Sequence, residues 1–142
     1  MEWTKLVDTS TYFILGGLAN SLFTTLHMML AAKPTWYRYF GADKLAEMHE
    51  KGSNFPQWAT VALVFLFGIW AAYGFSAAGA IQPLPFMRTM IIIIIVVYFL
   101  RSLMILSEIF KVIFRGYRFR FIIFSAGAFA TSMMYYLGLK GM

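Results

Sequence analysis

Four long apolar segments leave this chain few choices of fold. They are Tyr12–Ala32, Trp58–Ile81, Thr89–Phe110 and Phe121–Leu139. A helix needs roughly 20 residues to cross the ~30 Å hydrocarbon core of a bilayer, and each segment has about that length. None alternates apolar and polar residues with the period of two that a membrane β-strand needs. We therefore predict an all-α polytopic membrane protein, a four-transmembrane-helix bundle over residues 1–142 with a single domain.

The composition agrees with a membrane protein. The 142 residues are 61% hydrophobic and only 13% charged, which is too apolar for a soluble domain of this size. Glu2 and Asp8 precede the first apolar segment, whereas a cleavable signal peptide begins with basic residues, so we expect a retained span. The chain has no Cys, which excludes disulfides and thiolate metal sites.

The connection between the first two segments is the only substantial stretch predicted outside the membrane. Pro34 is expected to end the first helix. A short amphipathic helix follows over Asp43–Lys51, with Asp43 as N-cap, Glu47 and Lys51 as an i,i+4 pair and Gly52 just past its end. Leu45 and Met48 share one face, so this helix is predicted to lie on the membrane surface.

The net charge of +6 is distributed as in a membrane protein, which argues against a nucleic-acid partner. Basic residues collect beside the helix ends, and cytoplasmic loops carry the excess. Eight lie in the first and third loops: Lys33, Arg38, Lys44, Lys51, Lys111, Arg115, Arg118 and Arg120. Three lie on the opposite side: Lys5, Arg88 and Lys140. This imbalance places both long loops in the cytoplasm and both termini outside it.

Arg101 stands out because it follows the apolar run MIIIIIVVYFL of the third segment. An arginine at bilayer depth costs roughly 2.5–3.5 kcal/mol, while each residue of Ile91–Val97 returns about 0.3–0.6 kcal/mol, so the segment still inserts. Ionisable residues inside membranes usually face a partner or a wet cavity. Arg101 is therefore the best indication of a functional site.

Two polar helix faces are predicted to form that site. In the first segment Asn20, Thr24 and His27 share a face with Gly16, and in the third Tyr98, Arg101 and Glu108 share a face with Ile105. Antiparallel spans would place Asn20 level with Arg101, and His27 level with Glu108. The predicted ligand-binding residues are Arg101, Asn20, His27, Thr24, Glu108 and Tyr98.

Each of these residues also has a structural interpretation. Arg101 could pair with Asn20, a hydroxyl or a backbone carbonyl and hold the helices together. Glu108 lies near a helix end and could meet Lys111 or Arg115. His27 alone is more often a packed histidine than a ligand. Small-residue stripes on the second and fourth segments read as packing surfaces: Gly68, Ala72 and Gly79, and Ser125, Ala128 and Ser132.

Several chemistries are disfavoured by the sequence. His27 and His49 lie on different elements without metal-ligand spacing, so no haem or zinc site is expected. The chain has no nucleophile elbow and no glycine-rich phosphate loop. We predict no cofactor, no metal and no catalytic residue.

Three sequence blocks resemble a family of small four-helix proteobacterial inner-membrane proteins. They are LHMMLAAKPTWYRYFGADKLAEMHEKGSNFP, YGFSAAGAIQPLPFMR and VVYFLRSL. The matching positions are His27, Tyr37, Phe40, Gly41, Gly52, Pro56, Arg88 and Arg101. The layout is also loosely similar to DoxX-like four-helix proteins. The resemblance implies four helices and a bacterial inner-membrane location, and it supplies no activity.

Two functions from different classes follow. The first is a protein that binds or passes a small solute, ion or lipid through a polar site between spans one and three. Because one chain encloses little volume, transport would need a homo-oligomer. The second is a non-transporting accessory, regulatory or immunity-type protein that docks on another membrane protein. An enzyme acting on lipid or quinone is a third, weaker reading.

Overall fold

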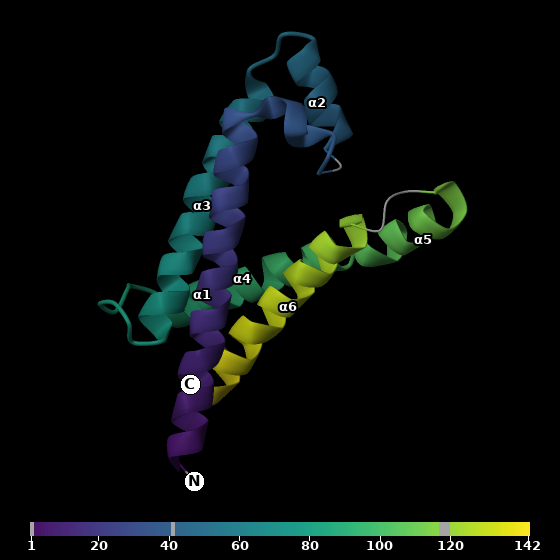
Figure 1. Ribbon diagram of the computed structural model, residues 1–142. Coiled ribbons are helices and arrows are strands. Elements are labelled where there is room, and N and C mark those ends of the chain that lie inside the picture. Colours follow the sequence, from purple (N-terminus) through teal and green to yellow (C-terminus); the bar gives the residue numbers. More distant parts are fainter. Residues whose placement is uncertain (1, 41, 117–119) are drawn as a thin grey trace. The chain divides into compact units, whose positions relative to one another are not determined.

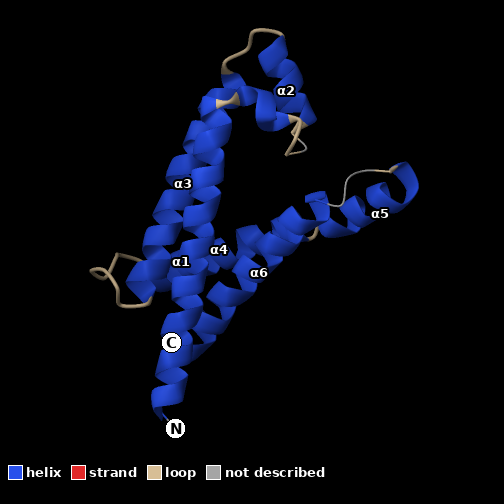
Figure 2. Cartoon of the chain, viewed as in Figure 1, coloured by secondary structure: helices blue, strands red, loops and turns tan. Residues whose placement is uncertain are grey.

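The computed structural model describes residues 2–40, 42–116 and 120–142, with side chains described from residue 9 onward except at 41 and 117–121. All regular secondary structure in these ranges is helical (Figure 2). The helices are α1 Glu2–Ala32, the 3₁₀ helix η1 Pro34–Tyr37, α2 Asp43–Glu50, α3 Phe55–Ala77, α4 Met87–Ser102, α5 Ile105–Arg115 and α6 Arg120–Gly141. Gly41 and Arg118 lie outside the described residues, as do the side chains of Glu2, Lys5, Asp8, Arg120 and Phe121.

Four described segments are long and apolar enough to cross a membrane, as predicted. They are Thr9–Ala32, Phe55–Ala77, Met87–Arg115 and Ile122–Gly141. Three boundaries differ from the prediction. Helix α1 already begins at Glu2, α3 ends at Ala77 where a turn follows, and the third segment is divided between α4 and α5.

The chain forms two compact units. Residues 1–19 and 70–142 make up the first unit, and residues 20–69 make up the second. Helices α1 and α3 each contribute to both units. The single domain expected from the sequence stays a prediction.

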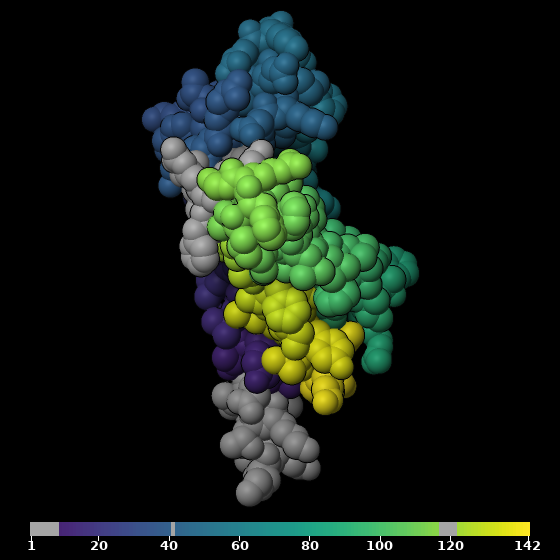
Figure 3. All heavy atoms as spheres, turned by 90° about the vertical axis from the view of Figure 1, so that its right-hand side faces the viewer, coloured from purple at the N-terminus to yellow at the C-terminus, as the bar shows by residue number. Residues whose placement is uncertain are grey.

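In the first unit α4 and α6 run side by side and antiparallel (Figure 1). Two hydrogen bonds give the register: Arg101 of α4 bonds to Ser125 of α6, and Ser132 Oγ donates to the carbonyl oxygen of Ile95 at 2.9 Å. The atoms of these two helices, green and yellow in the space-filling view, form one continuous packed surface (Figure 3).

Tyr135 is the centre of packing in the first unit. It is fully buried, its ring meets Phe13 edge-on at 6.2 Å, and its hydroxyl donates to the carbonyl oxygen of Trp70 at 2.9 Å. Gly16 and Gly74 leave room for this ring, because a Cβ on either would lie 2.6 Å from a Tyr135 atom. A single residue of α6 thus packs against α1 and α3.

The second unit closes around Tyr37. This buried side chain bonds Pro56 O at 3.0 Å and lies 2.6 Å from Thr60 Oγ1, which joins η1 to α3. Leu30 and Ala46 complete its apolar cluster, against which Leu45 packs. Leu45 therefore faces protein, whereas Met48 on the same short helix is exposed.

The short helix itself is confirmed, with one correction. Asp43 is the first residue of α2 and not its N-cap, since Ala42 occupies the cap without a side-chain hydrogen bond. The predicted Glu47–Lys51 pair forms at 2.8 Å, and Gly52 has a positive φ of 87° after the helix end. Pro34 begins η1 directly after α1 ends at Ala32, as expected.

Candidate functional site

Arg101, Ser125 and Glu108 form a polar cluster in the first unit. Arg101 Nη1 donates to Ser125 Oγ at 2.7 Å, and the Ser125 hydroxyl in turn donates to Glu108 Oε2. Arg101 Nη1 also lies 3.6 Å from Glu108 Oε1, which is an ion-pair distance. The serine hydroxyl thus accepts from the cation and donates to the carboxylate.

A break in the third apolar segment positions the two charges. Helix α4 ends at Ser102 and α5 begins at Ile105, with Leu103 and Met104 between them. Across the break the backbone makes shorter-range bonds, Met104 N to Arg101 O at 3.3 Å and Leu106 N to Leu103 O at 3.4 Å. The predicted continuous helix over Thr89–Phe110 is therefore interrupted.

The break puts each charge at the helix end that suits it. Arg101 occupies the last turn of α4, where the helix dipole is negative. Glu108 occupies the first turn of α5, where it is positive. The same two residues inside one straight helix would lack this favourable placement.

The two charged side chains differ in exposure. The Arg101 side chain is 41% exposed and that of Glu108 only 13%. Among the described residues, only Ser125 and Glu108 interact with Arg101, and both do so through Nη1. The Nε and Nη2 donors make no hydrogen bond to a described residue, so they are open to solvent or to another molecule.

Ser125 is the residue that sequence reasoning placed differently. The sequence analysis assigned it to a packing stripe with Ala128 and Ser132. It is fully buried, as a packing residue would be, but its hydroxyl joins Arg101 to Glu108. A polar residue on the buried face of an apolar helix was the available signal, since such a group needs a partner.

Tyr98 serves packing in the same unit. It is 4% exposed, and its ring meets Trp70 edge-on with 5.3 Å between the ring centroids. Ile105, on the same predicted face, becomes the first residue of α5. Of the predicted third-segment residues, Arg101 and Glu108 are thus the two that the structure joins in a polar cluster.

The predicted first-segment residues belong to the second unit, and the polar groups of Thr24 and His27 bond to their own helix. Thr24 Oγ1 donates to the carbonyl oxygen of Asn20 at 2.9 Å. His27 Nδ1 donates to the carbonyl oxygen of Phe23 at 2.7 Å, and its ring lies 4.8 Å from the ring of Phe67. The Asn20 side chain is fully buried and has an interaction partner. A site shared by these residues and Arg101 stays a prediction.

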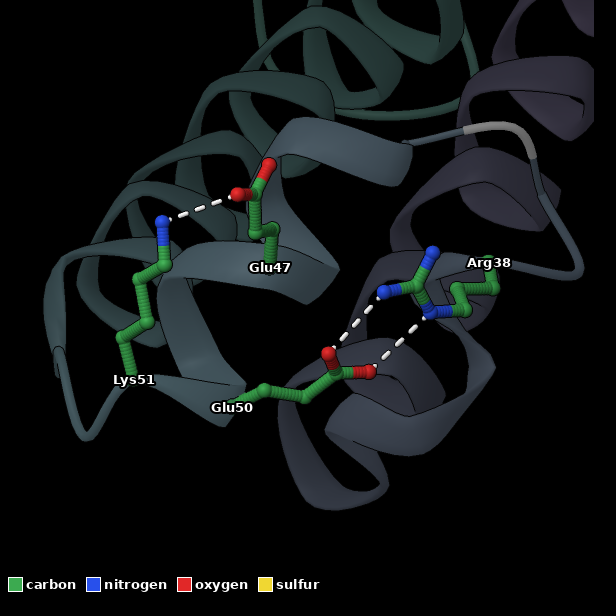
Figure 4. Close-up of polar contacts among 4 residues, drawn as sticks. All are labelled: Arg38, Glu47, Glu50 and Lys51. Carbon is green, nitrogen blue, oxygen red and sulfur yellow. Dashed lines mark hydrogen bonds and ion pairs between the residues drawn. The ribbon is translucent and has the colours of Figure 1, made fainter.

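Two ion pairs, Arg38–Glu50 and Glu47–Lys51, lie on the exposed surface around α2 (Figure 4). Arg38 Nε and Nη2 donate to the two Glu50 carboxylate oxygens at 3.0 and 2.9 Å, in a bidentate arrangement. These hydrogen bonds lower the pKa of Glu50 and raise the pKa of Arg38. Glu47 binds Lys51 at 2.8 Å, so Glu47 and Glu50 each have a cationic partner.

No group of three or more His, Asp or Glu side chains among the described residues is arranged to hold a metal ion. Comparisons with protein-family models, with characterised proteins and with solved structures find no match. The resemblance to proteobacterial inner-membrane proteins and to the DoxX-like layout therefore stays a prediction.

Proposed function

We propose that this chain is a small multi-pass protein of the bacterial inner membrane that binds an anionic oxygen group, from a lipid headgroup or a small solute, at Arg101. One observation carries the proposal: Arg101 is anchored on Ser125 through one nitrogen, while 41% of its side chain is exposed. A guanidinium presents planar paired donors that match a carboxylate or a phosphate.

The neighbouring carboxylate fits this role. A lone arginine within a membrane span is costly, and a nearby Glu108 lowers the net charge of the empty site. Because the pair uses Nη1, an arriving anion can take Nε and Nη2 without displacing Ser125. The site is thus compatible with reversible binding.

The charge distribution supports an orientation with both termini outside the cytoplasm. Eight basic residues flank the first and third loops and three the other side. Contacts within the first unit bring the two ends of the chain together, because a Cβ on Gly141 would touch Thr9. A reporter that is active only in the cytoplasm should therefore be silent after Met142 and active after Lys51. Reporter activity after Met142 would show that the C-terminal end lies in the cytoplasm and that the proposed orientation is wrong.

A non-transporting accessory protein is the second candidate, and the pairing itself favours it. Ser125 and Glu108 both contact one guanidinium nitrogen of Arg101 within one unit. Such contacts would suffice for a purely structural link between α4, α5 and α6. In that case Arg101 stabilises the fold and no anion binds. The two candidates therefore differ in a measurable affinity.

The test is a binding titration in a mild detergent, with melting temperature as readout. The probes are inorganic phosphate and phosphatidylglycerol, with phosphatidylcholine as the neutral lipid. Arg101→Lys keeps a cation beside Glu108 but loses the planar fork, so binding should weaken about tenfold, close to the value of one charge-assisted hydrogen bond. Arg88→Lys, at the other end of α4, should bind as the parent protein does.

The outcomes separate the readings. Stabilisation by phosphatidylglycerol alone identifies a lipid headgroup as the ligand, and stabilisation by phosphate identifies a solute. If neither probe raises the melting temperature, or if Arg101→Lys and Arg88→Lys respond equally, Arg101 is structural and the binding proposal is wrong.

A further inference from the structure

Helix α5 has two chemically distinct faces. At 100° per residue, Ser107, Glu108, Lys111 and Arg115 occupy one arc of the helix. Leu106, Phe110, Ile113 and Phe114 occupy the adjoining arc, and all four are exposed. No residue of α5, which is described over its whole length, is buried. Among the described residues, this apolar face of α5 is therefore left exposed.

The third apolar segment is too long to be one straight transmembrane helix. Its 29 residues, Met87–Arg115, would extend about 44 Å at 1.5 Å per residue, against a hydrocarbon core of ~30 Å. In a helix along the bilayer normal, about ten residues would lie beyond the core. The break at Leu103 and Met104 sets off a piece of that size, the 11-residue α5.

The register between α4 and α6 identifies the same piece. Ser125 pairs with Arg101, and Ser132 pairs with Ile95. Continued at equal rise per residue, this register puts Ile122 level with about Met104 and Gly141 level with about Phe86. The apolar span Ile122–Gly141 is thus matched in depth by α4 alone. If α5 continued the rise of α4, its residues beyond Leu106 would lie outside the depth range that α6 crosses.

We infer that α5 lies in the plane of the membrane surface, with its apolar face in the acyl-chain boundary and its polar face against anionic phospholipid headgroups. A helix that projected into water would leave four large apolar side chains solvated, and a helix that continued across the bilayer would carry its polar arc into hydrocarbon. An amphipathic helix in the interface avoids both.

The charges of the polar face select an anionic lipid surface. Lys111 and Arg115 are cations, while the one acidic residue, Glu108, is already engaged by Ser125 and Arg101. Arg118 and Arg120 follow directly in the sequence. Each basic residue near an anionic leaflet favours binding by about fivefold. The inference needs only a chain that crosses a membrane, and it does not depend on a ligand at Arg101.

Spin labels test the inference in vesicles of the full-length protein, because the chain has no native Cys. Single cysteines at Leu106, Phe110 and Ile113 sample one face of α5. They should give one common shallow depth, about 5–10 Å below the headgroups, with high accessibility to oxygen. Labels at Ile92, Val96 and Leu100 of α4 provide the matched control, and their depths should change by ~6 Å at each step of four residues.

Two results would overturn the inference. If label depth changes along α5 as it does along α4, α5 is part of the transmembrane span. If the labels on α5 are as accessible to a water-soluble nickel reagent as a label at Ser107 is, α5 lies in water.

The lipid is tested with phosphatidylcholine vesicles with and without phosphatidylglycerol. Arg115→Gln should lower the ratio of membrane-immersed to released α5 about fivefold, and Arg88→Gln should leave this ratio unchanged. An Ile113 label that responds to neither change excludes the anionic surface.

Discussion

Arg101 and Glu108 lie on opposite sides of the break between α4 and α5, yet their side chains meet at 3.6 Å next to the Ser125 hydroxyl. Three helices thus contribute one residue each to the cluster. The pairing gives the cation of the third apolar segment a partner within its own unit. The two side chains differ in exposure, since that of Glu108 is far less exposed than that of Arg101.

This difference in exposure predicts that removing either charge lowers the free energy of unfolding by a different amount. Arg101→Gln leaves the Glu108 carboxylate, which is only 13% exposed, without its cation and should lower the free energy of unfolding by about 1–3 kcal/mol. Glu108→Gln leaves a half-exposed arginine that can reach headgroups or water, so the loss should stay below ~1 kcal/mol. Unfolding in sodium dodecyl sulfate, followed by circular dichroism, measures both.

The double variant completes that cycle. Removal of both charges should recover part of the loss caused by Arg101→Gln, because the unpaired carboxylate is gone. Equal losses in the two single variants would contradict the predicted difference in cost. Strictly additive losses in the double variant would show that the 3.6 Å pair does not couple the two residues.

Ser125→Ala should loosen the cluster without removing a charge. The fully buried hydroxyl makes two hydrogen bonds, and such bonds between membrane helices average ~0.6 kcal/mol and reach ~1.7 kcal/mol. We expect a loss of about 1 kcal/mol in the same unfolding assay. Ser107→Ala, on the exposed surface of α5, is the matched control and should be neutral. Equal effects at both serines would refute the bridging role.

Gly74→Ala tests the close approach of α3 to α1. A Cβ there would lie 3.0 Å from the Cα and the backbone N of Gly17 and 2.6 Å from the Tyr135 hydroxyl. Backbone atoms cannot move aside as a side chain can, so the overpacking should cost about 1–3 kcal/mol. Gly68→Ala in the same helix meets no described atom within 4 Å and should cost nothing. A stable Gly74→Ala variant would mean that the helices are farther apart.

Glu50 gives a pH-dependent prediction outside the spans. Because the hydrogen bonds from Arg38 lower its pKa in the folded protein, the contact between η1 and α2 is stabilised above the ordinary glutamate pKa and is lost as the pH falls through the lowered value. Carbon-13 NMR of the Glu50 carboxyl should show the titration midpoint rise in Arg38→Gln. Lys51→Gln should not move it, since Lys51 bonds to Glu47. An unchanged midpoint in Arg38→Gln would contradict the pairing.

The four apolar helices were predictable because length and hydropathy are properties of the sequence alone. The break at Leu103 and Met104 was not, because both residues are good helix formers and neither glycine nor proline marks the position.

Two of the three residues of the polar cluster were predictable from the sequence. The helical period placed Arg101 and Glu108 on one face, and an intramembrane charge requires a partner. The identity of that partner depends on the antiparallel register of α4 and α6, which single-sequence periodicity does not contain. Thr24 and His27 were predicted in the site from the same helical period, and the structure adds hydrogen bonds from both side chains to backbone carbonyls of their own helix, which periodicity does not indicate.

Native mass spectrometry of the protein released from a mild detergent tests the central claim most directly. The parent protein should retain a phospholipid or a small anion, with phosphatidylglycerol retained in preference to phosphatidylcholine when both are added if the ligand is a headgroup. Arg101→Lys should lose this adduct while remaining folded, and Arg88→Lys should keep it. An adduct that survives in Arg101→Lys, or a parent protein that carries none after either probe is added, would contradict an anion-binding site at Arg101.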